Sequence, residues 1–230
     1  MKKLPPMLLV VIALAVSGLA QGPAFEVSKL PTSAATPDAF TQAGWKVEEV
    51  VKGDLNGDGK PDAAIKLAQI EASRESGIEG DRVLVIVFGD GGQWKLAAVG
   101  TKILQCVDCG GAFYGVMPAP ANVNIVKGGQ LIVENEHGSR DVSNSRFTFR
   151  YNAASGKFLL IGYDYTDNDR LTGAWTTEST NYSTNVRITK TGKGKRSTTK
   201  RTTIKPTKVY LEDANGDDIE YQALHRLGLD

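Results

Sequence analysis

Residues 54–62 combine oxygen-bearing side chains with glycines in the order Asp-Leu-Asn-Gly-Asp-Gly-Lys-Pro-Asp. Alternate side chains at the first, third and fifth positions converge on one point when the backbone curls, and Gly59 permits that curl. Ca²⁺ is a hard cation that takes six to eight oxygen ligands. The spacing therefore predicts a calcium site, with an ion-free hairpin turn as the alternative. The expected ligands are Asp54, Asn56, Asp58, the backbone carbonyl of Lys60, and Asp62 directly or through water.

This loop departs from an EF-hand. An EF-hand loop ends with a bidentate Glu at position twelve, and here that position is Ile65. The flanking segments 45–52 and 62–68 have the composition of strands rather than helices. The remaining coordination must therefore come from water or from residues elsewhere in the chain.

The run Gly-Asp-Leu-Asn-Gly-Asp-Gly-Lys-Pro-Asp-Ala-Ala-Ile at 53–65 resembles the calcium segment of FG-GAP or VCBS-type repeats of secreted bacterial proteins. That resemblance implies a strand–loop–strand unit in a small β domain or a propeller blade, with the same five calcium ligands. A single copy argues against a whole propeller within this chain. The loop, Cys-x-x-Cys-Gly-Gly, Phe-Thr-Phe-Arg-Tyr and Leu-Ile-Gly together also resemble uncharacterised secreted bacterial proteins, which implies no activity.

Cys106 and Cys109 are the only cysteines, and two Gly residues follow them. In an oxidising compartment two thiols usually pair, so a structural disulfide is the favoured interpretation. A bridge that closes so small a loop can be strained and reducible, which leaves a redox role open. The two thiols could also bind zinc together with His137, or stay free.

His137 follows an expected strand within Glu134-Asn135-Glu136-His137-Gly138-Ser139-Arg140. These residue types could form a hydrolytic active site in a loop, with His137 as the general base and Glu134 or Glu136 as the group that orients it. The chain has no Gly-x-Ser-x-Gly elbow, so a polar loop residue is favoured over a hydrolase site near His137 and Arg140.

Residues 190–208 hold eight Lys or Arg and no acid. On a two-stranded ribbon at about 180–208 these cations could bind an anionic polymer of the cell envelope. The segment lacks aromatic residues for base stacking, and lysines also protect exposed edge strands. The cations expected to make such contacts are Lys193, Lys195, Arg196, Lys200 and Arg201.

Short apolar runs, many Thr and Val residues and frequent turn signals predict a mainly β fold of antiparallel sheets, sandwich-like or partly propeller-like, with one or two short helices. Helices are expected at 37–43 and 219–227. A near-continuous apolar run at 82–88 predicts a strand buried on both faces. Further strands are expected at 94–99, 122–126, 130–135, 145–151, 157–164, 180–190 and 196–205. The acidic segment 213–218 imitates the first three ligand positions of loop 54–62, but Asp218 stands where Gly is needed, so a solvated turn is favoured over a second calcium loop. Segment 163–169 is a weaker candidate of the same kind.

Residues 1–20 read as a signal peptide, with Lys2 and Lys3, an apolar run of about ten residues, and small residues up to Ala20. Residues 21–35 read as a flexible leader, and 36–230 as a single β-rich domain without a transmembrane span. These features predict a secreted or periplasmic calcium-binding β domain that acts as a non-enzymatic structural or binding module of the cell envelope. An extracellular hydrolase and an anion-binding protein are the competing hypotheses.

Overall fold

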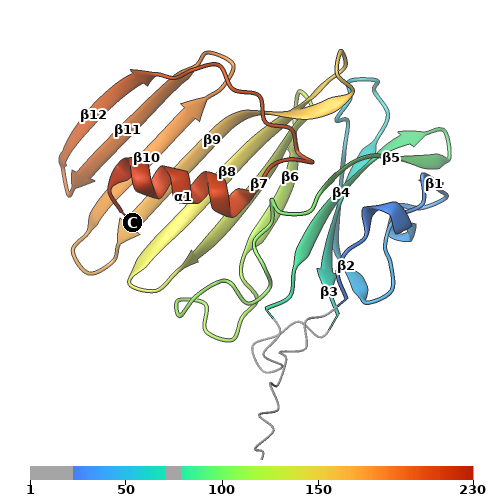
Figure 1. Cartoon of the computed structure of the whole chain (residues 1–230), viewed down its shortest axis with the longest axis horizontal. Coiled ribbons are helices and arrows are strands. Elements are labelled where there is room, and N and C mark those ends of the chain that lie inside the picture. Colours follow the sequence, from blue (N-terminus) through green and yellow to red (C-terminus); the bar gives the residue numbers. More distant parts are fainter. Residues whose placement is uncertain (1–22, 71–78, 230) are drawn as a thin grey trace, which may run out of the picture.

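The computed structural model describes residues 23–70 and 79–229 as two antiparallel sheets and one α-helix (Figure 1). The predicted mainly β, antiparallel fold is confirmed. In spatial order the five-stranded sheet contains β1 (Ser33–Ala34), β5 (Gln93–Gly100), β4 (Arg82–Asp90), β3 (Asp62–Gln69) and β2 (Trp45–Gly53). The seven-stranded sheet contains β12 (Arg196–Thr203), β11 (Val186–Lys193), β10 (Ala174–Asn181), β9 (Lys157–Asp169), β8 (Asp141–Asn152), β7 (Gln130–Gly138) and β6 (Ala121–Val126).

The smaller sheet is covered on both faces, because alternate side chains of its central strands belong to two different apolar clusters. Leu84 and Ile86 of β4 pack in a core shared with Phe147 and Phe149 of the larger sheet. Val85 and its neighbours on the opposite face pack in a second core with residues from the N-terminal segment. The prediction that the 82–88 strand is buried on both faces is therefore confirmed.

The described part of the expected leader is packed against this second core. Phe25 contacts Trp45 edge-on at 4.9 Å between ring centroids, and the Trp45 indole donates to the Pro23 carbonyl at 3.1 Å. The 3₁₀ turn η1 (Val27–Lys29) and strand β1 follow. The prediction of a flexible leader is wrong for residues 23–35, because their apolar side chains cover the outer face of the sheet.

The helix expected at 37–43 is only a 3₁₀ turn, η2 (Pro37–Ala39). Pro37 starts it as expected, but the Thr36 side chain makes no capping hydrogen bond. Phe40 leaves the turn to become fully buried in the second core. Burial of this aromatic ring ends the turn before an α-helix forms.

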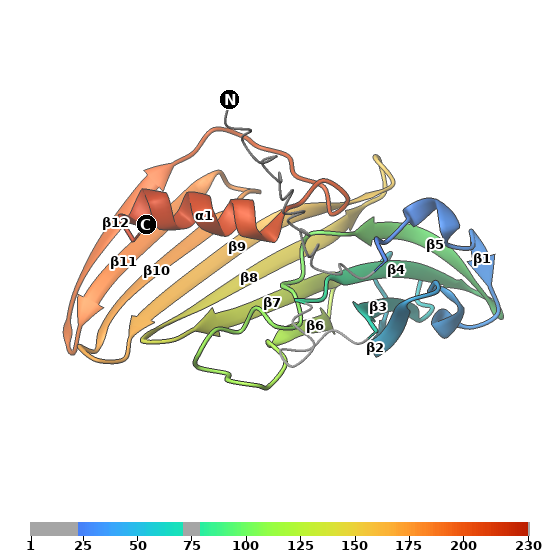
Figure 2. The same cartoon turned by 60° about the horizontal axis from the view of Figure 1, so that its bottom comes forward.

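The one α-helix of the described residues, α1 (Gly216–Leu227), lies across a face of the larger sheet (Figures 1 and 2). Asn215 Oδ1 accepts hydrogen bonds from the amides of Asp217 and Asp218, and Gly228 ends the helix in the left-handed conformation. The expected helix at 219–227 thus begins three residues earlier. Within the acidic segment 213–218, Asp213 lies in an exposed turn as expected, whereas Asn215 and the residues after it form the N-terminus of the helix.

The segment from 157 to 203 contains one more hairpin than expected. β9 runs to Asp169, the chain turns at 170–173, and β10 pairs with both β9 and β11. The single strand expected at 180–190 is therefore two strands, divided by a turn in which Asn185 has a positive φ. The sequence gives no clear signal for this turn, because polar and apolar residues alternate through a Thr-rich stretch on both sides of it.

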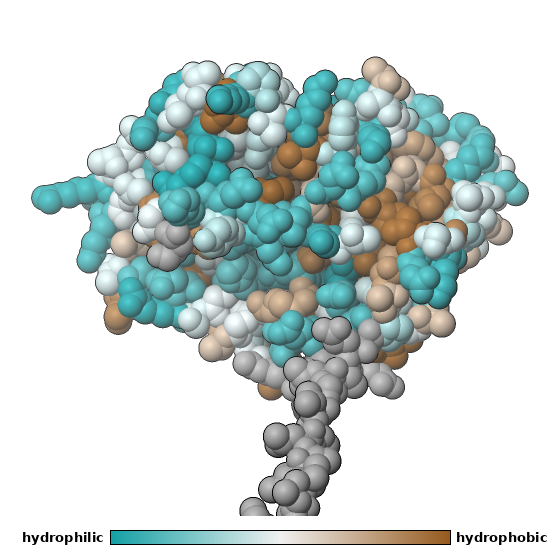
Figure 3. Space-filling model, viewed as in Figure 1, coloured by the Kyte–Doolittle hydropathy of each residue, from teal (hydrophilic) through white to brown (hydrophobic). Residues whose placement is uncertain are grey.

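Hydrophilic side chains cover most of the face on which α1 lies, and apolar side chains gather over the smaller sheet (Figure 3). Within residues 23–70 and 79–229, no helix combines the length and the apolar character that crossing a membrane requires.

Candidate calcium loop and its surroundings

The loop 54–62 joins β2 to β3, so its two ends are held by paired strands, as Gly53 lies opposite Asp62 in the register. Asp54 accepts hydrogen bonds from the amides of Gly57 at 2.7 Å and Gly59 at 3.0 Å. Both glycines have φ near +80°, a conformation that L side chains resist. The glycines therefore allow the backbone to curl around the Asp54 carboxylate.

The next two predicted ligands repeat this arrangement. Asn56 Oδ1 accepts from the Asp58 amide at 2.9 Å, and Asp58 Oδ1 accepts from the Lys60 amide at 2.8 Å. A carboxylate or amide oxygen has two lone pairs. An oxygen that accepts one hydrogen bond from a backbone N–H can therefore still bind a cation. Asp54 and Asp58 make no ion pair with any described residue.

Asp62 is positioned differently. It is fully buried; Oδ2 accepts from the amides of Leu55 at 2.8 Å and Asn56 at 3.2 Å, and Oδ1 accepts from Gly89 at 3.1 Å. Burial raises the pKa of the Asp62 carboxyl, and the three amides only partly oppose that rise. Asp62 therefore ties the loop to β4, a role that the sequence pattern did not reveal.

The Lys60 side chain is within electrostatic range of Asp58 but makes its ion pair outside the loop. Its ammonium pairs with Asp90 at 3.1 Å, which raises the pKa of Lys60. Asp90 also pairs with Lys95 at 2.7 Å, and the two lysines lower the pKa of Asp90. The backbone carbonyl of Lys60 is the atom that was expected to bind calcium, so this ion pair does not compete for it.

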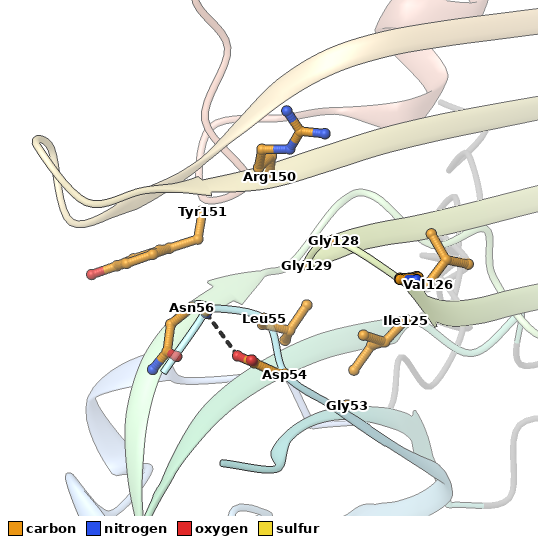
Figure 4. A pocket seen from close by; sticks show the side chains of 12 residues that line it. Gly53, Asp54, Leu55, Asn56, Ile125, Val126, Gly128, Gly129, Arg150 and Tyr151 are labelled. Carbon is orange, nitrogen blue, oxygen red and sulfur yellow. Dashed lines mark hydrogen bonds between the residues drawn. The ribbon is translucent and has the colours of Figure 1, made fainter. Parts of the chain in front are cut away.

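A groove of about 620 Å³ opens beside the loop, where the loop meets the larger sheet (Figure 4). Asp54, Leu55 and Asn56 line one side, and Ile125 with the β6–β7 turn lines the other. Leu55 is only 2% exposed and belongs to the core that both sheets share. The loop is therefore part of the junction between the two sheets.

The three carboxylates of the loop do not converge as a preassembled cluster. Among the described residues, three acidic, cysteine or histidine donor atoms come within 4.8 Å of one another only at Glu79, Cys106 and Cys109. A calcium ion on the loop would therefore need Asn56, the Lys60 carbonyl and water as well as Asp54 and Asp58.

Cys106 and Cys109 form the expected disulfide, with Cα atoms 5.2 Å apart. The pair lies in a loop, where the Cys109 amide donates to the Cys106 carbonyl at 3.4 Å. Arg82, 4% exposed, donates to the carbonyls of Gln105, Cys106 and Ala119. The guanidinium thereby fixes this loop to β4.

His137 lies within β7 opposite Ser143, not in a loop. Its Nε2 is 2.6 Å from Glu220 of α1. That contact raises the pKa of His137 more than desolvation lowers it, and Asp217 and Asp167 add to the rise. The acidic partner of His137 is therefore Glu220 of the helix, 83 residues away in sequence, and not the neighbouring Glu134 or Glu136 that the sequence suggested.

Those two nearby acids belong to other contacts. Glu134 pairs with Arg146 at 2.6 Å, and Glu136 accepts hydrogen bonds from Tyr114 and from Asn144 at 3.4 Å. Burial and the bond to Glu136 raise the pKa of Tyr114 to about 12. The predicted pairing of His137 with Glu134 or Glu136 is wrong, because alternation along a strand turns Glu136 to the face opposite His137.

Arg140 also lies away from His137, in the β7–β8 turn. Its guanidinium pairs with Asp169 at 2.7 Å, which lowers the pKa of that carboxyl. The weak candidate segment 163–169 forms the second half of strand β9, with Tyr163 and Tyr165 fully buried.

Sequence reasoning missed a polar network between α1 and the larger sheet. Ser145 donates to Glu220 at 2.7 Å and contacts the Tyr163 hydroxyl at 3.1 Å. Further along, the fully buried Glu178 carboxylate pairs with Arg226 at 2.5 Å and Arg187 at 3.2 Å. No local pattern joins these residues, because the helix meets strands that are far away in sequence.

The basic segment forms the edge of the larger sheet. β11 and β12 pair over residues 186–203, and every residue of β12 is exposed. Among the described residues, none of the eight cations at 190–208 makes an ion pair. The cations concerned are Lys190, Lys193, Lys195, Arg196, Lys200, Arg201, Lys205 and Lys208.

The signal peptide expected at 1–20 lies outside the described residues. No protein-family model, curated protein or solved structure matches this chain.

Proposed function

We propose that this protein is an exported calcium-binding β domain in which the ion stabilises the junction between the two sheets, as a non-enzymatic structural or binding module of the cell envelope. The observation that carries the proposal is the curl of loop 54–62 around Asp54, Asn56 and Asp58, with no described cation paired to either acid.

The donor set suits calcium. Carboxylate, amide and carbonyl oxygens are the ligands that Ca²⁺ prefers, and their number leaves room for water. Asp54 and Asp58 repel each other without a cation, so bound calcium would favour the closed curl. Leu55 transmits that preference to the shared core, because its side chain is buried there.

Isothermal titration of the chelator-treated protein with Ca²⁺ tests the proposal. We expect one binding event in the wild type and its loss in Asp54→Ala and Asp58→Ala. Asp38→Asn, an exposed acid in η2, is the control and should bind like wild type. Absence of binding by the folded wild-type protein would reject calcium as the ligand.

The edge hairpin supports a second function, the binding of an anionic polymer. Six of the eight cations at 190–208 lie on this hairpin, and none of the six has an ion-pair partner among the described residues, whereas its Arg187 pairs with the buried Glu178. Phosphate, sulfate or carboxylate groups can reach the exposed strand β12, which carries several of the six. A cationic surface binds such polymers with an affinity that falls as salt rises.

Heparin, as a soluble anionic polysaccharide, provides the test of this second function. The double variant Lys200→Gln/Arg201→Gln should elute from immobilised heparin at lower salt than the wild type. Lys46→Gln/Lys102→Gln removes the same charge from exposed positions outside the hairpin and should elute later than the hairpin variant. Equal elution of the two variants would mean that the hairpin is not the binding surface.

A further inference from the structure

The most distinctive group of metal-ligand atoms in the described residues lies away from the calcium loop. The carboxylate of Glu79 and the two sulfurs of Cys106 and Cys109 lie within 4.8 Å of one another. Glu79 and Cys109 are exposed, and Cys106 is partly exposed. The group borders a cavity of about 480 Å³ that is also lined by His137 and Asp217.

The backbone holds Glu79 beside the cysteines. The Asp108 amide, between the two cysteines, donates to the Glu79 carbonyl at 3.0 Å, and the Val107 amide donates to the Gly80 carbonyl at 2.8 Å. On its other side, the Val107 carbonyl accepts from the Ala119 amide at 2.7 Å. These bonds do not involve the sulfurs, so they can persist when the disulfide is reduced.

The cysteines cannot bind a metal while they are bridged, because a metal ligand must be a thiolate. We propose that reduction converts Glu79, Cys106 and Cys109 into a zinc site, so that the disulfide controls metal binding. This site is independent of the calcium loop. Thiolate sulfur and carboxylate oxygen are both protein ligands of Zn²⁺, which lies about 2.3 Å from sulfur and 2.0–2.2 Å from oxygen.

The chemistry balances with a dithiol as the reductant. One dithiol transfers two electrons and two protons to the bridge, breaks the S–S bond, leaves as its own disulfide, and yields two cysteine thiols. Zn²⁺ then forms two Zn–S bonds and releases both thiol protons to solvent.

Three protein ligands leave one coordination position of a tetrahedral zinc ion open. The cavity provides space for water or a small ligand at that position. The proposed site therefore has two sulfurs that bind metal only when reduced and one open coordination position. A purely structural disulfide needs neither the nearby carboxylate nor the adjoining cavity.

Cobalt(II), an optical substitute for zinc, tests the proposal on the full chain. Protein reduced under anaerobic conditions should develop the near-ultraviolet sulfur-to-cobalt absorption, which Zn²⁺ then abolishes, whereas oxidised protein should not. Cys106→Ser should lose this absorption. Glu79→Gln should weaken binding at least about ten-fold, which is the lower end of the loss seen for outer-shell partners of metal ligands.

Asp81→Asn is the matched control, because Asp81 lines the same cavity but lies outside the ligand group. It should bind cobalt like the wild type, as should Asp54→Ala in the calcium loop. Reduced protein without the absorption would overturn the proposal, and so would unfolding on reduction as seen by circular dichroism. If Glu79→Gln binds cobalt as tightly as the wild type, the Glu79 carboxylate is not a ligand of the site.

Discussion

Asp62 is the most constrained acid of the calcium loop. Its buried carboxylate accepts three backbone hydrogen bonds, two from within the loop and one from Gly89 of β4. The proposed ligand Asp58, in contrast, is exposed and makes only local contacts. Asp62 therefore has a structural role in the loop, whereas the role proposed for Asp58 is to bind calcium.

Asp62→Ala should lower the free energy of unfolding by about 2–5 kcal/mol even without calcium, because it leaves the buried Leu55 amide without an acceptor, at about 1–3 kcal/mol, and two part-buried amides at a smaller cost each. Asp58→Ala should change the stability of the calcium-free protein little and remove the response to calcium. Urea unfolding in chelator measures both. Equal losses in the two variants would contradict this division of roles.

His137 makes stability depend on pH. Glu220 raises the pKa of His137 above the ordinary 6.5, with Asp217 of the same helix and Asp167 of β9 also facing the ring. The folded state therefore binds the proton more tightly than the unfolded state. The resulting stabilisation is complete below the unfolded pKa and is lost as pH rises through the folded pKa.

The difference in unfolding free energy between wild type and His137→Gln should thus be largest near about pH 5.5 and shrink as the pH rises through the raised pKa of the folded state. Chemical denaturation at several pH values measures it, and Glu220→Gln should flatten the profile in the same way. A difference that stays constant across this range would show that protonation of His137 does not contribute.

At the scale of elements, the β6–β7 turn of the larger sheet packs closely against loop 54–62. Gly129 has φ +69°, and a Cβ at this position would lie 2.9 Å from the Leu55 carbonyl oxygen. Gly128 has φ +88°, but a Cβ there would meet nothing within 4 Å. Any other residue would be strained at both positions because of the positive φ. Only at Gly129 would a side chain also collide with loop 54–62.

Gly128→Ala should cost about 1–2 kcal/mol through left-handed backbone strain alone. Gly129→Ala should cost more and should also weaken calcium binding, because the loop must shift to admit the methyl group. Thermal unfolding and calcium titration of both variants compare them directly. Equal calcium affinities would mean that the turn does not support the loop.

The contact of α1 with β10 depends on the buried Glu178 carboxylate. Removal of Arg226 leaves that charge with Arg187 as its only ion-pair partner among the described residues. Arg226→Met should therefore cost up to about 3–5 kcal/mol, and adding Glu178→Gln should recover part of the loss. A double variant as unstable as the single variant would argue against an electrostatic origin.

Sequence reasoning predicted elements best where alternation and turn residues coincide. The strands around loop 54–62 and the buried strand at 82–88 agree with β2, β3 and β4 to within a few residues. It missed the β10–β11 turn, where Asn185 takes a positive φ inside uniform Thr-rich alternation. The Glu220 and Glu178 contacts could not be predicted, since they depend on where α1 meets the sheet.

The whole molecule has an uneven distribution of charge. Of its 27 basic residues, eight lie in the acid-free segment 190–208, so the other 19 accompany 26 acids. A net charge of +1 therefore conceals a cationic sheet edge on an otherwise acidic protein. The proposed calcium loop lies in the acidic remainder, at the junction between the sheets.

Because the loop packs into the core that the two sheets share, calcium bound there should stabilise the whole fold. A ligand that binds only the folded state contributes about 2.7 kcal/mol at a hundred-fold excess over its Kd. The effect should therefore appear as a shift of global unfolding, not only as a local change in the loop.

Thermal unfolding of chelator-treated protein, with and without added Ca²⁺, tests this claim most directly. We predict that the Tm of the wild type rises with calcium and falls again when chelator is restored, and that the Tm of Asp54→Ala does not respond. An identical wild-type Tm in calcium and in chelator would contradict the claim that this loop stabilises the fold by binding calcium.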